Sequence, residues 1–493
     1  MMKILSRLAP LLFLMILLLP ATADAQQVEM THYRVKAYGS VANNDETPFW
    51  MVSNRYGVVP LEAGNGYMQA GVFHTQKLGK HFLLNAGLDL VAVAPRENNV
   101  YIQQLYASLN YSILQLRIGS KEDYNSLWDR NLSSGDMIQS ANARPIPEID
   151  LSVPQFTVIP KMKGWLQFKG HVSLGRSFDT GYLEKVINPA YFYNMKTLWH
   201  RKSLYLRIQD TQNHFPLSLT LGMRHGVQFG GESTNPKLGK QPQSFSDFFR
   251  VFFGKSGGEG SSVSDSINAL GNNFGTYDIQ LAYQKNGWSA KAYLQHFFED
   301  GSGMEWFNRW DGLWGLQIDI PFFPVSKVVF EILETRNQSG PFHFVNYDHS
   351  KYTGRGGGAD SYYNNGEYTT GLSYFNRAIG NPMLLSPEYD VDGRPGFRCN
   401  RVHNLHLGLE GSIIPGELTY RLLATYMNAW GTQYEPYLKK RRSGSGVVEI
   451  NYTPTSLAGW QFGCQLGMDK GSYIGDNLGL AISVSKTGII KTY

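Results

Sequence analysis

Three runs of alternating apolar and polar residues, within residues 277–323, constrain the fold more than any other feature of the chain. The first run, 277–284, has the two-residue period of a strand with one apolar face. Residues 286–287 are Asn-Gly, a pair that favours the positive backbone angles of a two-residue hairpin turn. The second run, 288–295, is followed by a long loop and then by the third run, 313–320. Tight turns at one end and a long loop at the other predict an all-β fold, a transmembrane antiparallel outer-membrane β-barrel.

The rest of the chain supplies a parity test, because a barrel with both termini in the periplasm needs an even number of strands. The alternation predicts about 18 strands. Their expected ranges are 33–41, 67–74, 82–93, 101–111, 114–120, 151–159, 164–174, 203–209, 217–229, 277–284, 288–296, 313–320, 327–334, 403–411, 417–427, 446–452, 460–470 and 478–486. The strand at 151–159 is the weakest prediction, because Pro154 cannot donate a hydrogen bond to a neighbouring strand. It is expected partly because the number of strands must be even.

With this threading every periplasmic connection is short and the long connections fall outside. A soluble sandwich has no reason to sort its loops by length, so the asymmetry favours the barrel. The longest segment, 335–402, contains a strand-like run at 368–374 that would break parity if it joined the wall. We therefore expect 335–402 to be a folded lid or plug loop, because its aromatic content favours order.

The first 25 residues predict the cellular compartment. Lys3 and Arg7, an apolar run at 11–19 and small residues near Ala25 are typical of a secretory signal peptide. Residues 26–493 are then expected to form a single barrel domain in the bacterial outer membrane. No later run reaches the roughly 18 apolar residues of a membrane helix, and a formal net charge of +5 is too small to indicate a nucleic-acid partner.

Several short motifs resemble the capsule-assembly Wzi family in its Bacteroidetes-type form, and together they span most of the mature chain. The motifs are Pro48-Phe49-Trp50, Asn142-Ala143-Arg144-Pro145-Ile146-Pro147-Glu148-Ile149, Asp311-Gly312-Leu313-Trp314-Gly315, Tyr362-Tyr363-Asn364-Asn365, Gly371-Leu372-Ser373-Tyr374-Phe375, Ile379-Gly380-Asn381-Pro382, Leu385-Ser386-Pro387 and Asn400-Arg401-Val402. The resemblance implies an 18-stranded outer-membrane barrel that helps capsular polysaccharide associate with the cell surface, acting as a lectin. Some members of the family add a small periplasmic helical bundle, for which this threading leaves room only in the few residues after Ala25.

Polysaccharide binding needs aromatic faces that stack on sugar rings, with amide, carboxylate and guanidinium groups for the hydroxyls and acidic substituents. Two outer segments have this inventory, and their predicted sugar contacts are Trp306, Asn308, Arg309, Trp310, Asp311, Tyr362, Tyr363, Asn364, Asn365, Tyr374, Asn376 and Arg377. The alternative is that these aromatic residues form the interfacial girdle or the core of a folded lid. Trp310 and Trp314 are the strongest girdle candidates.

The basic run Lys439-Lys440-Arg441-Arg442 is expected in an outer loop. It could attract an acidic polysaccharide or lipid phosphates, although a solvated charge run is the commoner explanation. Cys399 and Cys464 could form a disulfide in an exported chain, but two unpaired small side chains are the simpler expectation. His403 and His406 lack a third nearby ligand, so no metal site and no cofactor are predicted.

The sequence leaves three classes of function open. We expect a monomeric, non-enzymatic lectin whose partners are capsular polysaccharide and outer-membrane lipid or lipopolysaccharide, with many weak sugar contacts combined by multivalency. A porin or substrate-specific channel shares every barrel argument and differs in whether 335–402 leaves an aqueous path. An outer-membrane hydrolase is the third class, although no nucleophile motif stands out.

Overall fold

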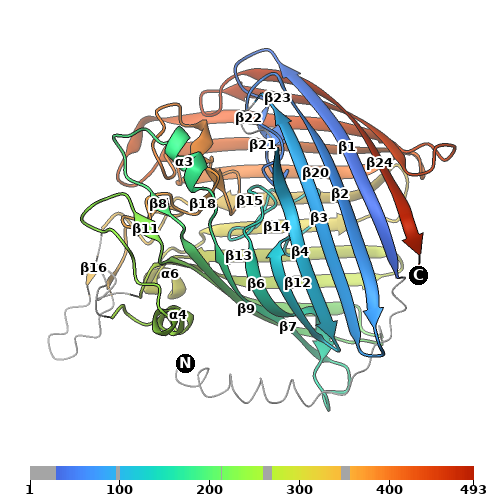
Figure 1. Cartoon of the computed structure of the whole chain (residues 1–493), viewed down its shortest axis with the longest axis horizontal. Coiled ribbons are helices and arrows are strands. Elements are labelled where there is room, and N and C mark those ends of the chain that lie inside the picture. Colours follow the sequence, from blue (N-terminus) through green and yellow to red (C-terminus); the bar gives the residue numbers. More distant parts are fainter. Residues whose placement is uncertain are drawn as a thin grey trace.

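The fold is described from a computed structural model that covers residues 29–95, 100–212, 214–258, 269–342, 344–345 and 356–492. Eighteen strands form one antiparallel sheet that closes on itself (Figure 1). The predicted signal peptide lies outside the described residues. Within them, no helix has the length and apolar character to cross a membrane.

Each wall strand overlaps one of the 18 predicted runs, so the predicted fold class is confirmed. The wall strands are β1 (Met30–Ala42), β2 (Asn65–Leu78), β3 (Phe82–Ala94), β4 (Val100–Tyr111), β5 (Leu114–Ser120), β6 (Glu148–Val158), β7 (Leu166–Arg176), β9 (Leu198–Gln209), β10 (Leu217–Phe229), β12 (Asn272–Lys285), β13 (Trp288–Phe298), β14 (Gly312–Asp319), β15 (Val325–Glu334), β20 (Val402–Ile414), β21 (Leu418–Gly431), β22 (Pro436–Tyr452), β23 (Trp460–Gly471) and β24 (Asn477–Thr492).

Local sequence explains the turns and the irregularities of the wall. Lys285 pairs with Trp288 across the predicted two-residue hairpin, and Asn286 and Gly287 have φ values of 52° and 81°, as such a turn requires. Pro154 lies within a register shift of the β6–β7 pair, between Val153 and Thr157, because a bulge tolerates the missing N–H. The weakest predicted strand is therefore real.

The barrel closes through β1 and β24, which pair from Met30 with Thr492 to Ala42 with Gly479. The last strand, β24, is longer than the range 478–486 that its alternating pattern predicted. A strand can extend past its alternating core wherever a neighbour supplies hydrogen bonds, and the N-terminal part of β1 does so here.

The remaining elements lie in the long connections, which gather at one end of the barrel (Figure 1). The helices are α2 (Phe49–Val52), α3 (Thr180–Val186), α4 (Phe245–Phe252), α6 (Gly301–Met304) and the 3-10 turn η1 (Pro387–Tyr389). Two-residue strands pair as β8 (Asn194–Met195) with β11 (Glu232–Ser233), β16 (Phe344–Val345) with β17 (Gly356–Gly357), and β18 (Ser373–Tyr374) with β19 (Arg377–Ala378). The strand-like run at 368–374 thus makes only a small hairpin outside the wall, as parity required.

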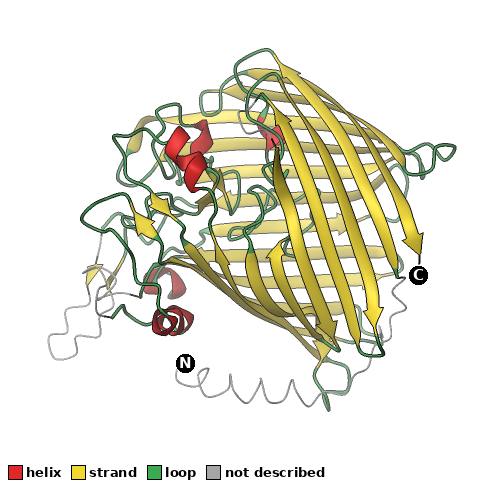
Figure 2. Ribbon diagram, viewed as in Figure 1, coloured by secondary structure: helices red, strands yellow, loops and turns green. Residues whose placement is uncertain are grey.

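Strand alternation divides the side chains between the lumen and the outer surface. On β9, Leu204, Leu206 and Ile208 are exposed and apolar, whereas Tyr205 is buried and donates a hydrogen bond to Asp278 of β12 at 2.6 Å. Loop segments lie inside the ring of strands in Figure 2. The main hydrophobic cluster combines inward wall residues with residues of these loops, so the core of the protein fills the lumen.

Candidate functional site: a plugged lumen and its outer mouth

Connection 121–147, between β5 and β6, lies in the lumen and is anchored at Asp136. The Asp136 carboxylate accepts hydrogen bonds from the guanidinium of Arg224 on β10, from Gln295 Nε2 at 3.1 Å and from Trp128 Nε1 at 2.9 Å. Burial alone would raise the pKa of Asp136, but the Arg224 charge and the donated N–H groups outweigh it and hold the pKa below its ordinary value. Asp136 is therefore a buried, charged anchor between this connection and the wall.

A second anchor of the same connection is Glu331 of β15. Its carboxylate accepts hydrogen bonds from Ser133 Oγ at 2.6 Å and from the Ser134 backbone N–H at 2.7 Å. On β20, His406 Nε2 lies 2.8 Å from the Leu132 carbonyl oxygen and donates to it. Inward side chains of at least three strands thus hold 121–147 across the barrel.

The connection between β1 and β2, residues 43–64, also enters the lumen. Trp50 of α2 is fully buried and donates from Nε1 to Thr425 Oγ1 at 2.9 Å, while the Phe49 N–H donates to Asp469 at 2.9 Å. A Cβ at Gly467 would come within 2.5 Å of the Met51 sulfur. Glycine on β23 therefore gives α2 the space to lie directly on the wall.

The described part of 335–401 joins the other two connections. The Tyr363 hydroxyl donates to the Met137 carbonyl oxygen at 2.6 Å and accepts from the Asn381 N–H at 2.8 Å. Arg377 donates to the Val59 carbonyl oxygen at 2.7 Å and pairs with Glu388. We call residues 43–64, 121–147 and the described part of 335–401 together the plug, because they bind one another inside the barrel. This confirms the predicted lid or plug loop and adds two segments to it.

A cavity of about 880 Å³ lies beneath the plug. Its lining includes Lys291 and Lys327, near the periplasmic ends of β13 and β15, and Trp128 and Arg130 of the plug. The cavity thus lies between the plug and the periplasmic ends of the strands.

Most of the residues predicted to contact sugar are buried, either in the plug or where the loop after β13 meets it. Asn308, Asp311, Tyr362, Tyr363, Tyr374, Asn376 and Arg377 are buried, and Asn364 and Asn365 are partly buried. Several of them bond to the protein itself: Asn308 Nδ2 donates to the Phe297 carbonyl oxygen at 2.6 Å and to the Tyr362 hydroxyl at 2.8 Å. In this conformation their side chains hold loops together.

The exposed members of the predicted set, Trp306, Arg309 and Trp310, lie in the loop after β13. The Trp306 ring stacks on His296 with centroids 3.8 Å apart, and Trp310, which is 67% exposed, packs against Trp314. His296 and Trp314 alternate with the inward residues Gln295 and Leu313, so both face the outer surface. The loop therefore lies against the outside of the wall, as the girdle interpretation requires for Trp310 and Trp314.

Four carboxyl groups meet where this loop touches the plug: Glu299, Asp300, Asp311 and Asp360. Burial raises the pKa of Asp311 to about 7, and burial together with the nearby Asp300 charge raises the pKa of Asp360 to about 7. Burial also raises the pKa of Glu299 well above its ordinary value. Because these raised pKa values lie close to neutral pH for Asp311 and Asp360, we interpret this contact as a proton-dependent joint. Among the described residues, no group of three or more His, Cys, Asp or Glu side chains is arranged to hold a metal ion.

The basic run at 439–442 was predicted in a loop, and that prediction is wrong. These residues belong to β22, which begins at Pro436 and pairs Arg442 with Asn428 and Arg441 with Ala429. The sequence concealed the strand because four adjacent cations break the apolar alternation, whereas backbone pairing with β21 requires no such pattern. Cys399 and Cys464 are both free, the first buried and the second exposed.

The outer end of β22 meets the plug in a charged surface that the sequence did not single out. Arg394 and Arg398 of the plug pair with Glu435 at 2.7 Å and 3.7 Å, and the Arg441 guanidinium lies 4.2 Å from the Tyr437 ring centroid. Arg398 also lies within electrostatic reach of Tyr437. We call these five residues the mouth ridge. The cations at 394 and 398 were visible in the sequence, but their approach to Glu435 depends on the fold.

A closed 18-stranded barrel with short turns at one end, a lumen filled by its own connections and a charged mouth defines a plugged outer-membrane barrel. The family described as capsule assembly protein Wzi matches residues 31–384 of the chain. The protein belongs to this family, and this membership places it in capsule assembly at the bacterial outer membrane.

The solved structures that match the chain have low sequence identity to it. Pseudomonas aeruginosa OccK5 (OpdH) has 11% identity and a TM-score of 0.46, with 94% of this chain and 99% of that chain covered. Pseudomonas aeruginosa OpdK with vanillate has 11% identity and a TM-score of 0.47, with 94% and 98% covered. Salmonella typhi OmpF complexed with daunomycin has 9% identity and a TM-score of 0.42, with 93% and 97% covered. No curated protein matches the chain.

Proposed function

We propose that this protein is a non-enzymatic, monomeric lectin that holds capsular polysaccharide at the cell surface. The observation that carries the proposal is the mouth ridge, in which the exposed Arg441, two partly exposed arginines and the ring of Tyr437 stand at the outer end of a plugged barrel. Guanidinium groups bind carboxylates of an acidic glycan, and a flanking ring offers a face for a sugar. The plug supports a binding role over transport, because it is tied to the wall by buried polar contacts.

Retention of a long polymer does not require a tight site. Each contact with a repeating unit is weak, but a polymer presents many copies, so the effective concentration at the mouth is high once one unit has bound. In this proposal the predicted contact Arg309 is exposed enough to touch a glycan directly, whereas Trp306 and Trp310 pack against the outer side of the wall. The buried predicted contacts would support the plug that positions the ridge, and they would contact sugar only after a rearrangement.

The test measures binding of an acidic capsular polysaccharide to purified protein in detergent micelles, with neutral dextran as the comparison glycan. The double variant Arg398→Ala/Arg441→Ala is expected to lower the affinity about tenfold or more, and rising salt is expected to weaken wild-type binding because exposed charges are screened. Lys161→Ala, which removes an exposed cation at the opposite end of the barrel, is the matched control. Equal binding by both variants and the wild type would reject the ridge as the site.

A second measurement addresses the cellular role. In an encapsulated strain that carries only this family member, deletion of the gene is expected to move capsule from the cell surface into the medium. Complementation with the wild type should restore retention, and complementation with Arg398→Ala/Arg441→Ala should not. Unchanged retention after deletion would contradict the proposed function.

A further inference from the structure

Helix α4 lies on the outside of the barrel wall. The rings of Phe248 and Phe252 pack on His200 of β9, with centroid distances of 5.3 Å and 5.4 Å. The Lys202 ammonium donates to the Phe252 carbonyl oxygen, at the end of the helix where cations are favoured. Since Tyr205 faces the lumen, strand alternation places His200 and Lys202 on the outer surface. The connection between β10 and β12 therefore folds back over the wall.

The position of α4 relative to the membrane follows from the length of β9. A membrane-spanning strand needs roughly 9 to 11 residues, and the outward apolar side chains of β9 begin at Ile208, beside the periplasmic turn. A membrane-spanning segment of roughly 9 to 11 residues that starts at Ile208 and runs towards the outer end of β9 ends at about residue 198. Helix α4 covers positions 200 and 202, so it lies at the level of the outer leaflet.

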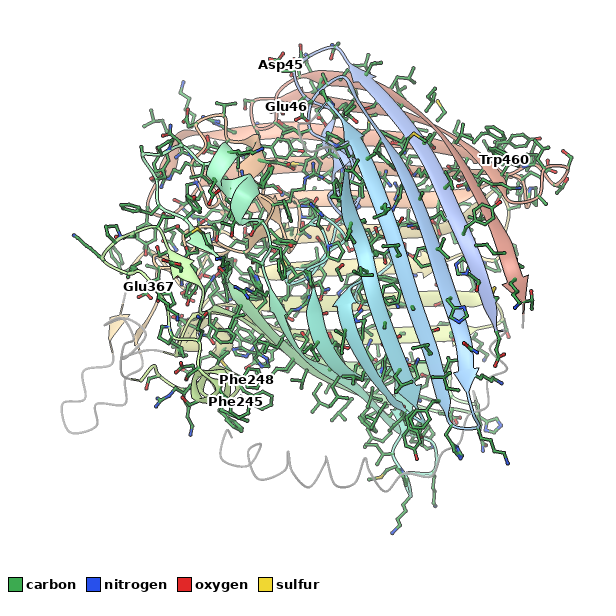
Figure 3. All side chains as sticks on the ribbon, in the orientation of Figure 1. Asp45, Glu46, Phe245, Phe248, Glu367 and Trp460 are labelled. Carbon is green, nitrogen blue, oxygen red and sulfur yellow. The ribbon has the colours of Figure 1, made fainter. Side chains whose placement is uncertain are left out.

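The apolar surface of α4 is wider than its contact with the barrel. At about 100° per residue, Phe245, Phe248, Phe249, Val251, Phe252 and Phe253 cover an arc of roughly 200°, twice the stripe that packing on one surface needs. Val251 is fully buried with Val227 and Phe229 of β10. Phe245, Phe249 and Phe253 are 79%, 44% and 40% exposed. Figure 3 shows Phe245 and Phe248 outside the ring of strands.

The charged residues of α4 lie beside this exposed arc. Ser244 and Asp247 form a capping box that fixes the start of the helix. Arg250 lies about 100° beyond Phe249 and donates to the Ser256 carbonyl oxygen, and Lys255 is exposed near the end of the helix. Aromatic residues with flanking cations are typical of a helix that lies in a membrane interface.

The same side of the barrel carries further exposed rings, since Trp306 and Trp310 pack on the outward residues His296 and Trp314 of neighbouring strands. The exposed arc of α4 is thus continuous with the lipid-facing wall. We propose that α4 is an in-plane helix whose Phe245, Phe249 and Phe253 insert among the acyl chains of outer-leaflet lipid. In this arrangement Arg250 and Lys255 lie at the level of the phosphorylated headgroups. The inference does not depend on the proposed sugar binding.

The test measures the depth of a nitroxide label in vesicles of phosphatidylethanolamine and phosphatidylglycerol. The label is attached at Phe249→Cys in a Cys399→Ser/Cys464→Ser background. We expect high collision with oxygen and low collision with a water-soluble nickel chelate, as for a label at Leu206→Cys on the exposed apolar wall. A label at Lys237→Cys, an exposed position in the same connection, should show the opposite pattern. A label at 249 that behaves like the label at 237 would overturn the proposal.

A second variant tests the same contact without a label. In the same vesicles, Phe245→Ser/Phe249→Ser is expected to speed hydrogen exchange of residues 245–252 about tenfold, because the apolar contact with lipid is lost. Lys237→Ala, at an exposed position in the same connection, should leave exchange of the helix unchanged. Residues 272–285 of β12 report whether the barrel itself stays folded. Equal exchange of the helix in the double variant and the wild type would also overturn the proposal.

Discussion

The plug and the outer-wall loops are built from the same kinds of residue but are attached in different ways. Inside the barrel, polar anchors such as Asp136 and Glu331 tie the plug to several strands, and rings such as Tyr363 are buried. Outside, the rings of α4 pack on His200 and Trp306 stacks on His296, and both elements leave apolar faces exposed beside a few hydrogen bonds. The environment explains the difference: an unpaired polar group is costly in the lumen core, whereas the outer wall is surrounded by lipid.

The largest expected effect is loss of the Asp136 anchor. Asp136→Ala would leave Arg224 buried without its carboxylate, which costs about 3 to 5 kcal/mol. We expect residues 121–147 to leave the lumen, with faster hydrogen exchange and open channels in planar bilayers, where the wild type conducts little. Asp476→Ala removes the partner of Lys470 in an exposed pair and should change stability by at most about 1 kcal/mol. A large open pore in the wild type would instead favour the channel interpretation.

A smaller effect is expected at the joint between two plug segments. Tyr363→Phe removes the hydroxyl that bonds Met137 and Asn381 and leaves two buried groups unpaired, at a cost of about 1 to 3 kcal/mol. Protection of 356–384 from proteolysis should fall, whereas Tyr426→Phe, at an exposed ring on the outer face of β21, should be close to neutral. Equal protection in the two variants would mean that the segments dock independently.

The joint between the plug and the loop after β13 should depend on pH. The pKa values of Asp311 and Asp360 are about 7 in the folded protein, above the ordinary value of 3.8, so folding favours their protonated forms. Their contribution is full below about pH 4 and is lost as the pH rises through 7. Hydrogen exchange of 299–311, corrected for its intrinsic pH dependence, should be slower at pH 5 than at pH 8. Residues near Asp136, whose pKa is lowered, should not change over this range.

The smallest effect on stability is expected outside the wall. Trp310→Ala removes a ring that is mostly exposed, so the free energy of unfolding should change by less than about 1 kcal/mol and the plug should keep its protection. Thermal unfolding and hydrogen exchange of 121–147 measure the two quantities. A loss of plug protection in this variant would mean that the inside and the outside of the wall are coupled.

The sequence predicted the wall well because every wall strand has to repeat a local pattern. The two-residue period of β12 and β13 and the Asn286-Gly287 turn are visible without knowledge of any neighbour. The requirement for an even number of strands then predicted the weak strand that contains Pro154. The outer end of β22 was missed because four cations there hide the period. The burial of the loop side chains could not be predicted in this way, since loop residues repeat no pattern.

By itself, the sequence determined the number and direction of the strands and the side on which the long connections emerge. Only the tertiary structure decided which aromatic residues fill the lumen, which cover the outer wall and which stay exposed. Tyr363 is buried because it meets Met137, 226 residues away, whereas Phe245, also an aromatic residue of a long connection, is 79% exposed. The physical reason is that burial depends on what packs against a side chain, and in a barrel those partners come from distant strands and loops.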